Sequence, residues 1–321
     1  MRYLITGGAG FIGSHLCEAL LNAGHEVVAL DNFNDYYSPE RKRRNVLSAQ
    51  SHPAYTLVEA DIRDIDALER VFQEQRPQRI AHLAAMANPR FSLRFPLLYE
   101  EVNVRGSLNL MLLAGQYQVE RFLLASTSSV YGLSPTPWSE DSPTDQPLSY
   151  YAATKKAAEV LAYTFYRQYN ISTAVVRFFT VYGPRGRPDM TPTLFVEPML
   201  RGEPITLFNG GVGVHRDWTY VDDIVRGVLA ALHADIGYEI FNLGNSQPVQ
   251  LIDFIGALER VTGLQAMIHS EPLPSPDPPM TYANVEKAGR MLGFEPLTSV
   301  NEGLAYFWAW YRDEILAHTS N

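Results

Sequence analysis

A tyrosine and a lysine at helical spacing, downstream of a run of hydroxyl side chains, are the residues of this chain best suited to proton transfer. Tyr151 and Lys155 are four residues apart, on one face of a helix expected over 151–169. The hydroxyl run closes an expected strand over 122–126 and reads Ser126-Thr127-Ser128-Ser129. A positive charge beside a phenol lowers its pKa, so Tyr151 is a candidate general base. The alternative is that Tyr151 packs in the core and the hydroxyls cap a helix.

A glycine-rich turn at the start of the chain predicts a dinucleotide site. Residues 2–13 read as an apolar strand, a tight turn and the start of a helix, where backbone N–H groups approach a pyrophosphate. Three glycines give this turn its G-x-x-G-x-x-G spacing: Gly7, Gly10 and Gly13. A second expected strand, over 27–30, ends at Asp31, whose carboxylate accepts hydrogen bonds from ribose hydroxyls and repels a 2′-phosphate. We therefore predict that the cofactor is NAD rather than NADP, and that Tyr151 serves hydride transfer at its nicotinamide.

Apolar runs alternate with helical patterns through the first 180 residues. The runs are nearly continuous, as in strands that helices cover on both faces. The expected strands are 3–6, 27–30, 56–60, 79–84, 122–126 and 173–179. The expected helices lie near 14–23, 66–75, 96–117 and 151–169. This order predicts an α/β fold with a doubly wound parallel sheet, the Rossmann arrangement.

Loops and prolines become frequent after residue 180, and the expected helices there lie near 222–234, 250–262 and 298–316. This part of the chain is interpreted as a smaller, mixed α/β lobe at the C-terminal side, which binds the substrate. The predicted NAD-binding domain is 1–179 together with about 218–243, and the predicted second lobe is 180–217 and 244–321.

Composition limits the classes of partner. The net charge of −9 argues against nucleic acid. The basic run 41–44 is expected on a solvated helix face, with a membrane surface as the less favoured reading. No apolar run reaches the ~18 residues of a membrane-spanning helix, and the first strand starts too early for a signal peptide. The single cysteine, Cys17, excludes an internal disulfide and fits a reducing cytoplasm, and the eight histidines show no metal-ligand spacing.

Several motifs, in the same order along nearly the whole chain, resemble the extended short-chain dehydrogenase/reductases. They are 6–15, 31–32, 61–62, 82–85, 131–132 and 151–155, and 216–223 resembles the late signature of the nucleotide-sugar branch. The resemblance implies that Thr127, Tyr151 and Lys155 are the catalytic residues. It also implies cofactor contacts from Gly7, Gly10, Phe11, Ile12, Gly13, Asp31, Asn32, Asp61, Ile62, Leu83, Ala84, Ala85, Asn103, Tyr151 and Lys155.

The reaction is narrowed by the residues that follow Thr127. Family members that dehydrate nucleotide sugars carry Asp-Glu there, whereas this chain has Ser128-Ser129, so dehydration is not expected. Segments 125–132 and 177–190 resemble UDP-glucuronate 4-epimerases. The resemblance implies that Tyr151, assisted by Thr127, takes the proton of the sugar 4-OH while C4 gives a hydride to NAD⁺, which returns it to the other face. The alternatives are a UDP-glucose 4-epimerase, a UDP-glucuronate decarboxylase and a non-catalytic NAD-binding regulator.

The resemblance also implies a set of substrate contacts and a homodimer. The substrate contacts are Thr127, Ser128, Ser129, Thr180, Arg187, Phe208, Arg216 and Asp277. Arg187 and the three hydroxyls are candidate donors to a sugar carboxylate, the alternative being that Arg187 contacts only diphosphate or solvent. Related enzymes commonly carry Arg or Gln where this chain has Pro274, which leaves the preference for the base open. The family's helices that match 96–117 and 151–169 usually form the dimer interface.

Overall fold

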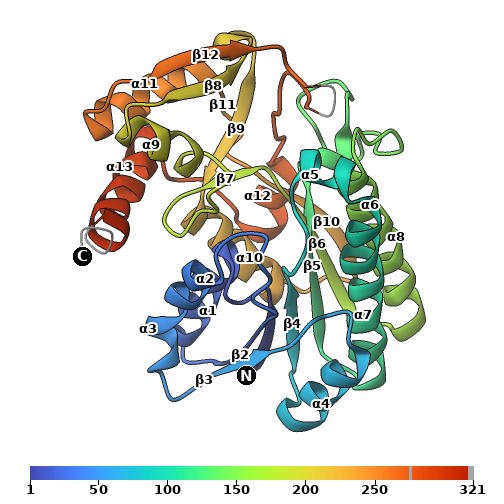
Figure 1. Cartoon of the computed structure of the whole chain (residues 1–321). Helices are drawn as coiled ribbons and strands as arrows, with labels where there is room; N and C mark the ends of the chain where they lie inside the picture. Colours follow the sequence, from blue (N-terminus) through green and yellow to red (C-terminus); the bar gives the residue numbers. More distant parts are fainter. Residues whose placement is uncertain (275–276, 317–321) are drawn as a thin grey trace.

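A seven-stranded parallel sheet forms the centre of the fold, in the order β10-β6-β5-β4-β1-β2-β3 (Figure 1). The computed structural model describes residues 1–274 and 277–316. The strands are β1 (Arg2–Thr6), β2 (Glu26–Asp31), β3 (Tyr55–Glu59), β4 (Arg79–His82), β5 (Arg121–Thr127), β6 (Ser172–Phe178) and β10 (Tyr238–Leu243). The predicted doubly wound α/β fold is confirmed. The strand order changes direction between β1 and β4, and in such sheets the crevice at the carboxyl ends of the strands binds ligands.

Helices cover both faces of this sheet, because successive residues of a strand point to opposite sides. In β1, Tyr3 and Ile5 pack in one apolar cluster and Leu4 packs in another. The first cluster includes residues of α1 (Phe11–Asn22) and α10 (Val221–His233). The second includes residues of α4 (Ile65–Gln75), α7 (Ser107–Gln116) and α8 (Tyr150–Tyr169). Burial on both faces explains why the strands are nearly continuous apolar runs.

The helix expected over 96–117 is observed as three consecutive segments. These are α6 (Pro96–Glu100), a π-helical turn (Glu101–Gly106) and α7. Shorter helices lie between β2 and β3 and after β4: α2 (Pro39–Asn45), α3 (Leu47–Gln50) and α5 (Pro89–Arg94). A 3₁₀ turn over Ser128–Tyr131 directly follows β5. Within residues 1–274 and 277–316, no helix is both long enough and apolar enough to cross a membrane.

The smaller lobe lies over the carboxyl ends of the main strands (Figure 1). It contains one three-stranded sheet, β11-β9-β7, and one two-stranded sheet, β12-β8. Its strands are β7 (Thr180–Tyr182), β8 (Pro204–Phe208), β9 (His215–Tyr220), β11 (Pro248–Gln250) and β12 (Met267–Glu271). Its helices are α9 (Thr193–Leu200), α11 (Leu251–Thr262), α12 (Glu286–Leu292) and α13 (Val300–Trp310), with a 3₁₀ turn at Asn209–Gly211 and a π-helical turn at Tyr311–Leu316.

The chain returns to the main sheet only at β10, later than the start of the predicted segment 218–243. Strand β10 does pair with β6 at the edge of the main sheet. Strand β9, however, pairs with β7 and β11, so residues 218–220 belong to the smaller sheet. The division into two domains stays a prediction, and the predicted second lobe also includes 275–276 and 317–321, which lie outside the described residues.

One residue of the basic run contradicts the expected solvated face. In α2, Arg43 and Arg44 are exposed, but Lys42 is buried. The Lys42 ammonium donates hydrogen bonds of 3.0 Å to the backbone oxygen and to Oδ1 of Asn34. The short helix therefore turns one cation inward, next to the carboxyl end of β2.

Candidate active site

The turn between β1 and α1 has no room for side chains. Gly7 has a φ of +69°, and a Cβ on it would lie 2.9 Å from the backbone nitrogen of Ala84. A Cβ on Gly13 would overlap the carbonyl oxygen of Gly7. Helix α1 begins after Gly10, with no side-chain cap and no acidic residue in its first turn. Its N-terminal N–H groups and its dipole therefore suit a pyrophosphate.

Asp31 ends β2 with its carboxylate held in place by the backbone. Oδ2 accepts a hydrogen bond of 3.2 Å from the Ala9 N–H, and Oδ1 accepts one of 2.9 Å from the Phe33 N–H. Burial raises the pKa of Asp31, while the charge of Lys42 and the two backbone bonds act in the opposite direction. The Lys42 ammonium lies 3.9 Å from Oδ1. The acceptor expected for a ribose is thus present, with a buried cation beside it.

One cavity connects this turn with the expected catalytic residues. It is lined by all the predicted cofactor residues except Asn103, and also by Thr127, Ser128, Ser129, Thr180 and Arg187. A glycine cradle, a helix N-terminus and a carboxylate at the end of β2 fit the pyrophosphate and a ribose of NAD. The residues that line the cavity therefore fit a dinucleotide that extends from Asp31 to Tyr151.

Asn103 lies behind the cavity wall, in the π-helical turn between α6 and α7. Its Oδ1 accepts a hydrogen bond of 2.9 Å from the Met86 N–H, and its Nδ2 donates to the Met86 oxygen at 3.0 Å and to Thr154 Oγ1 at 3.1 Å. Thr154 in turn donates to the backbone oxygen of Tyr151 at 2.9 Å. Asn103 therefore ties the π-helical turn to the start of α8, and its contact with the cofactor stays a prediction.

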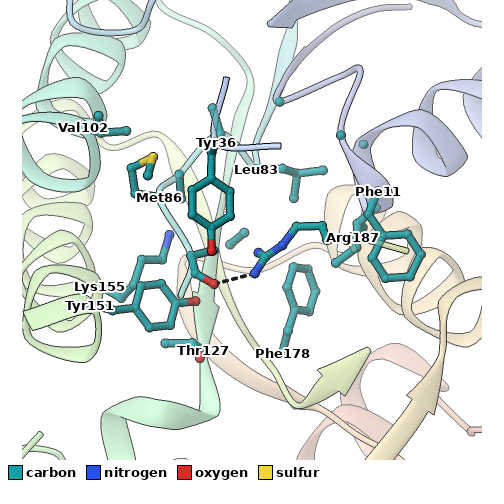
Figure 2. Close-up of a pocket in the computed structure, with 18 of the residues that line it drawn as sticks. Phe11, Tyr36, Leu83, Met86, Val102, Thr127, Tyr151, Lys155, Phe178 and Arg187 are labelled. Atoms are coloured by element: carbon teal, nitrogen blue, oxygen red, sulfur yellow. Dashed lines mark hydrogen bonds between the residues drawn. The ribbon is translucent and has the colours of Figure 1, made fainter. Parts of the chain in front are cut away.

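The catalytic candidates come together where β5 ends and α8 begins. Ser149 caps α8 by accepting a hydrogen bond from the Ala152 N–H, so Tyr151 and Lys155 lie in the first turns of the helix. Tyr151 lies beside Thr127, at the end of β5, and the Thr127 side chain lowers the pKa of the phenol; the Thr127 hydroxyl itself donates a hydrogen bond of 3.2 Å to Ser129 Oγ. Figure 2 shows the two hydroxyls facing each other, with Lys155 on the same side of the cavity. The structure thus brings the three predicted catalytic residues together.

Burial has the largest effect on the pKa values of Tyr151 and Lys155. It raises the pKa of Tyr151 above its ordinary value, and the neighbouring Thr127 side chain and the charge of Arg187 oppose this shift. In the protein by itself, burial thus outweighs the groups that lower the pKa of Tyr151, and a pKa lowered by Lys155 together with the nicotinamide ring of NAD stays a prediction. Burial also lowers the pKa of Lys155 to about 8, although the negative charge of Glu159 favours the ammonium.

Arg187 reaches the same space from the loop after β7. Its Nε and Nη2 each donate a hydrogen bond of 2.9 Å to Asp189, and Nη2 also donates to the Ala87 oxygen at 2.9 Å. Within the described part of the chain, Nη1 has no such bond and is the nitrogen left for a ligand. Figure 2 shows the guanidinium directed toward the space beside Tyr151.

Three of the predicted substrate contacts, Phe208, Arg216 and Asp277, lie outside this cavity lining and belong to a separate cluster. Arg216 Nη2 is 3.9 Å from Asp277 Oδ2. The same carboxylate oxygen accepts a hydrogen bond of 2.5 Å from Arg90, whose guanidinium lies 4.5 Å from the ring centroid of Phe208. Arg90 is therefore part of the cluster, although it belongs to no motif of the sequence.

Comparison with known proteins agrees with this geometry. The NAD dependent epimerase/dehydratase family matches residues 3–244. The chain belongs to this family. The predicted resemblance to the extended short-chain dehydrogenase/reductases is thereby confirmed.

Individual members of the epimerase/dehydratase family match over nearly the whole chain. A UDP-glucuronate 4-epimerase from Thermodesulfobacterium geofontis is 40% identical over 98% of this chain and 97% of its own length. The crystal structure of UDP-glucuronic acid 4-epimerase from Bacillus cereus, in complex with UDP-glucuronic acid and NAD, is 34% identical with a TM-score of 0.92, covering 98% of this chain and 99% of that one. A UDP-glucose 4-epimerase from Thermotoga maritima with UDP-glucose is 32% identical with a TM-score of 0.90, covering 98% and 99%. The similarity of the backbone to both structures thus does not show whether the substrate sugar is acidic or neutral. That distinction depends on the side chains of the site.

Proposed function

We propose that this epimerase-family protein interconverts UDP-glucuronate and UDP-galacturonate by inverting C4 of the sugar, with NAD as its cofactor. The observation that carries the proposal is the convergence of Arg187 and three hydroxyls, those of Thr127, Ser128 and Ser129, on the cavity that holds Tyr151. A guanidinium and neighbouring hydroxyls are good donors to a carboxylate. The full-length similarity to proteins named UDP-glucuronate 4-epimerase supports it.

Each residue then has a role that its position suits. NAD, when bound, supplies the acceptor for the C4 hydride and gives it back to the opposite face of the sugar. Tyr151 takes the proton from the sugar 4-OH and returns it, and the Thr127 hydroxyl beside it stabilises the phenolate, in line with its lowering effect on the pKa of Tyr151. The Lys155 ammonium favours the same phenolate by its charge. The glycine turn and Asp31 hold the cofactor.

Arg187 and the hydroxyls have a second task when the sugar is an acid. Oxidation at C4 creates a ketone beta to the carboxylate, and such acids lose CO₂ when the breaking bond aligns with the ketone π orbital. Arg187 and the hydroxyl trio hold the carboxylate out of that alignment. Phe208, Arg216, Asp277 and Arg90 hold the uridine diphosphate, with Arg216 on the diphosphate and Phe208 beside the base.

The pairing of Arg187 with Asp189 is the observation that favours a second candidate, a UDP-glucose 4-epimerase. The carboxylate of Asp189 already neutralises the guanidinium, which weakens its attraction for an anionic sugar. The two candidates differ in one experiment, which is proton NMR of UDP-glucuronate with the purified protein and no added NAD. Formation of UDP-galacturonate supports the first candidate, and a UDP-pentose with CO₂ identifies a decarboxylase instead. No change, even with added NAD⁺, contradicts the proposal, and UDP-glucose is then the next substrate to test.

We further propose a homodimer formed through the outer faces of the α6–α7 segment and α8. Large apolar side chains are exposed there, including Leu97 at 76% and Val160 at 57%. Apolar patches of this kind on neighbouring helices indicate a protein interface. Light scattering coupled to gel filtration tests the mass, and Val160→Glu is expected to shift it to that of the monomer. A cytoplasmic location stays a prediction based on the single cysteine.

A further inference from the structure

The loop that carries Arg187 is attached to the cofactor domain at both ends. At its start, Pro184 accepts a hydrogen bond through its backbone oxygen, 3.0 Å from Nε2 of His15, and Arg185 Nη2 bonds Glu18 at 2.8 Å. His15 and Glu18 belong to α1, the helix that follows the glycine turn. The sugar-binding arginine is thus held against the helix that binds the cofactor.

Asp189, at the other end of this loop, is the centre of a four-bond cluster. Oδ1 accepts from Arg187 Nε at 2.9 Å. Oδ2 accepts from Arg187 Nη2 at 2.9 Å, from the Tyr36 hydroxyl at 2.7 Å and from Asn88 Nδ2 at 2.9 Å. Burial by itself raises the pKa of Asp189, but these donors outweigh it and lower the pKa to about 2. The carboxylate is therefore ionised near neutral pH.

Tyr36 comes from the loop that follows Asp31, and it lines the cavity together with its neighbour Tyr37. Figure 2 shows its ring extending into the cavity, with the hydroxyl on the side of Arg187 and Tyr151. The ring is also fixed from the side by Phe91, in an edge contact with centroids 5.1 Å apart. Tyr36, in the loop after Asp31 (the cofactor loop), thus donates to the same Asp189 carboxylate that orients Arg187.

We propose that Asp189 and Tyr36 are positioning residues: Asp189 fixes the Arg187 guanidinium toward the sugar, and the Tyr36–Asp189 hydrogen bond ties the cofactor loop shut over NAD. The two bonds to Asp189 fix the direction of the Arg187 guanidinium. Among the described residues Nη1 has no hydrogen-bond partner, so it can donate to a sugar group that lies in that direction. Tyr36 lines the cavity, and its bond to Asp189 holds the loop after Asp31 beside it, so release of the cofactor would require this bond to break. The half of the proposal that concerns the sugar rests on the proposed function, whereas the half that concerns NAD does not.

Release of NAD from the purified protein tests Tyr36 without any substrate. NAD⁺ remaining with the protein is assayed after timed gel filtration and denaturation. Tyr36→Phe keeps the ring and removes one hydrogen bond to a charged group, so release is expected to become about tenfold faster. Tyr306→Phe, which removes a hydroxyl from an exposed ring on α13, is the matched control with an unchanged rate. An unchanged release rate in Tyr36→Phe would overturn the role given to this bond.

Kinetics with UDP-glucuronate and inhibition by UDP test Asp189. Asp189→Asn is expected to raise KM for UDP-glucuronate about tenfold, with a smaller change in kcat and no change in the inhibition constant of UDP, which lacks the sugar. Asp253→Asn, at an exposed position of α11, is the control. Equal losses for UDP-glucuronate and UDP would contradict a role at the sugar.

A double variant shows whether the two residues act through one bond. Because Tyr36→Phe removes the donor of the Tyr36–Asp189 bond and Asp189→Ala removes its acceptor, the variant that combines these two changes is expected to release NAD no faster than Asp189→Ala alone. Additive effects would contradict the proposal. If Asp189→Asn does not fold, Asn88→Ala removes another donor to the same carboxylate and is expected to raise KM in the same direction by a smaller factor. If the wild type shows no turnover of UDP-glucuronate, the proposed function fails, while the NAD measurements still decide the role of Tyr36.

Discussion

The Ser126 hydroxyl donates a hydrogen bond to the Glu159 carboxylate, with an Oγ–Oε1 distance of 2.6 Å. Ser126 directly precedes Thr127 on β5, and Glu159 lies one helical turn beyond Lys155 on α8. Arg177 of β6 donates two more bonds to this carboxylate, at 2.9 and 2.8 Å, and both side chains of the pair are 1% exposed. The Ser126–Glu159 bond therefore joins the strand that presents Thr127 to the helix that carries Tyr151, and the buried ion pair joins that helix to β6.

Replacing Glu159 by Gln is expected to destabilise the fold strongly. The change leaves the Arg177 charge buried without its counter-charge, a situation that costs about 3–5 kcal/mol of unfolding free energy. Urea unfolding measures it. Glu203→Gln is the matched control, because Glu203 pairs with Arg201 at the exposed surface and its loss is expected to change little. Equal stability of Glu159→Gln and the wild type would show that the pair contributes nothing net.

The contribution of Glu159 is also expected to vanish in acid. Burial raises the pKa of Glu159, but the hydrogen bonds and charge of Arg177 and the bond from Ser126 bring it below its ordinary value of 4.5. A group with a depressed pKa stabilises the fold above its ordinary pKa and loses this effect as the pH falls through the folded-state pKa. The difference in unfolding free energy between wild type and Glu159→Gln should thus be constant near neutral pH and shrink below pH 4.5. A difference that grows in acid would contradict the pairing.

Thr127→Val tests the effect of Thr127 on Tyr151, the proposed general base. Valine keeps the shape but removes the hydroxyl that lowers the pKa of Tyr151, so this pKa rises further above its ordinary value. The acid limb of kcat/KM is expected to move to higher pH, and the rate at neutral pH to fall about tenfold. Thr127→Ser restores a hydroxyl and should restore the profile. A Val variant with the wild-type profile would exclude this role for Thr127.

Local spacing made the main features of the site predictable. The glycine turn, Asp31 and the pair Tyr151 and Lys155 each occupy a short stretch of chain whose backbone geometry the sequence pattern fixes. The alternation of apolar runs and helices placed the first six strands of the main sheet to within about two residues. Because the carboxyl ends of parallel strands lie at the same edge of a sheet, Thr127 at the end of β5 could be predicted to lie near the glycine turn that follows β1.

Contacts between charges distant in sequence were not predictable in the same way. Tyr36 and Asp189 are 153 residues apart, and Arg90 and Asp277 are 187 apart. Nothing in the local pattern of Arg90 distinguishes it from a solvated arginine. Lys42 was expected in water because it stands in a basic run, and only the tertiary position of α2 beside Asn34 turns it inward.

Asp31→Asn is expected to relax the choice between NAD and NADP. The substitution removes the charge that repels a 2′-phosphate. It also removes the carboxylate that lies 3.9 Å from the Lys42 ammonium in the wild type, which leaves Asp35 as the other acidic group acting on this lysine. Affinity for NADP should rise and affinity for NAD should fall, as measured by calorimetric titration of each cofactor. In Asp31→Asn combined with Lys42→Met the gain for NADP should disappear. A gain that persists in the double variant would show that Lys42 does not reach the phosphate.

Replacing glycine by alanine at Gly13 and at Gly256 is expected to change the stability of the protein in opposite directions. In Gly13→Ala the new methyl meets the carbonyl oxygen of Gly7, so α1 must move away from the turn, at a cost of about 1–3 kcal/mol of unfolding free energy and with faster loss of NAD. Gly256 lies inside α11, and a methyl there would only contact an Arg260 nitrogen at 3.5 Å. Gly256→Ala should therefore stabilise the protein by up to about 1 kcal/mol, because alanine favours the helix more than glycine does. Thermal unfolding and NAD retention are measured for both variants. Close packing at the glycine turn predicts that Gly13→Ala lowers stability and Gly256→Ala raises it, whereas a general effect of adding a methyl group predicts a change in the same direction for both.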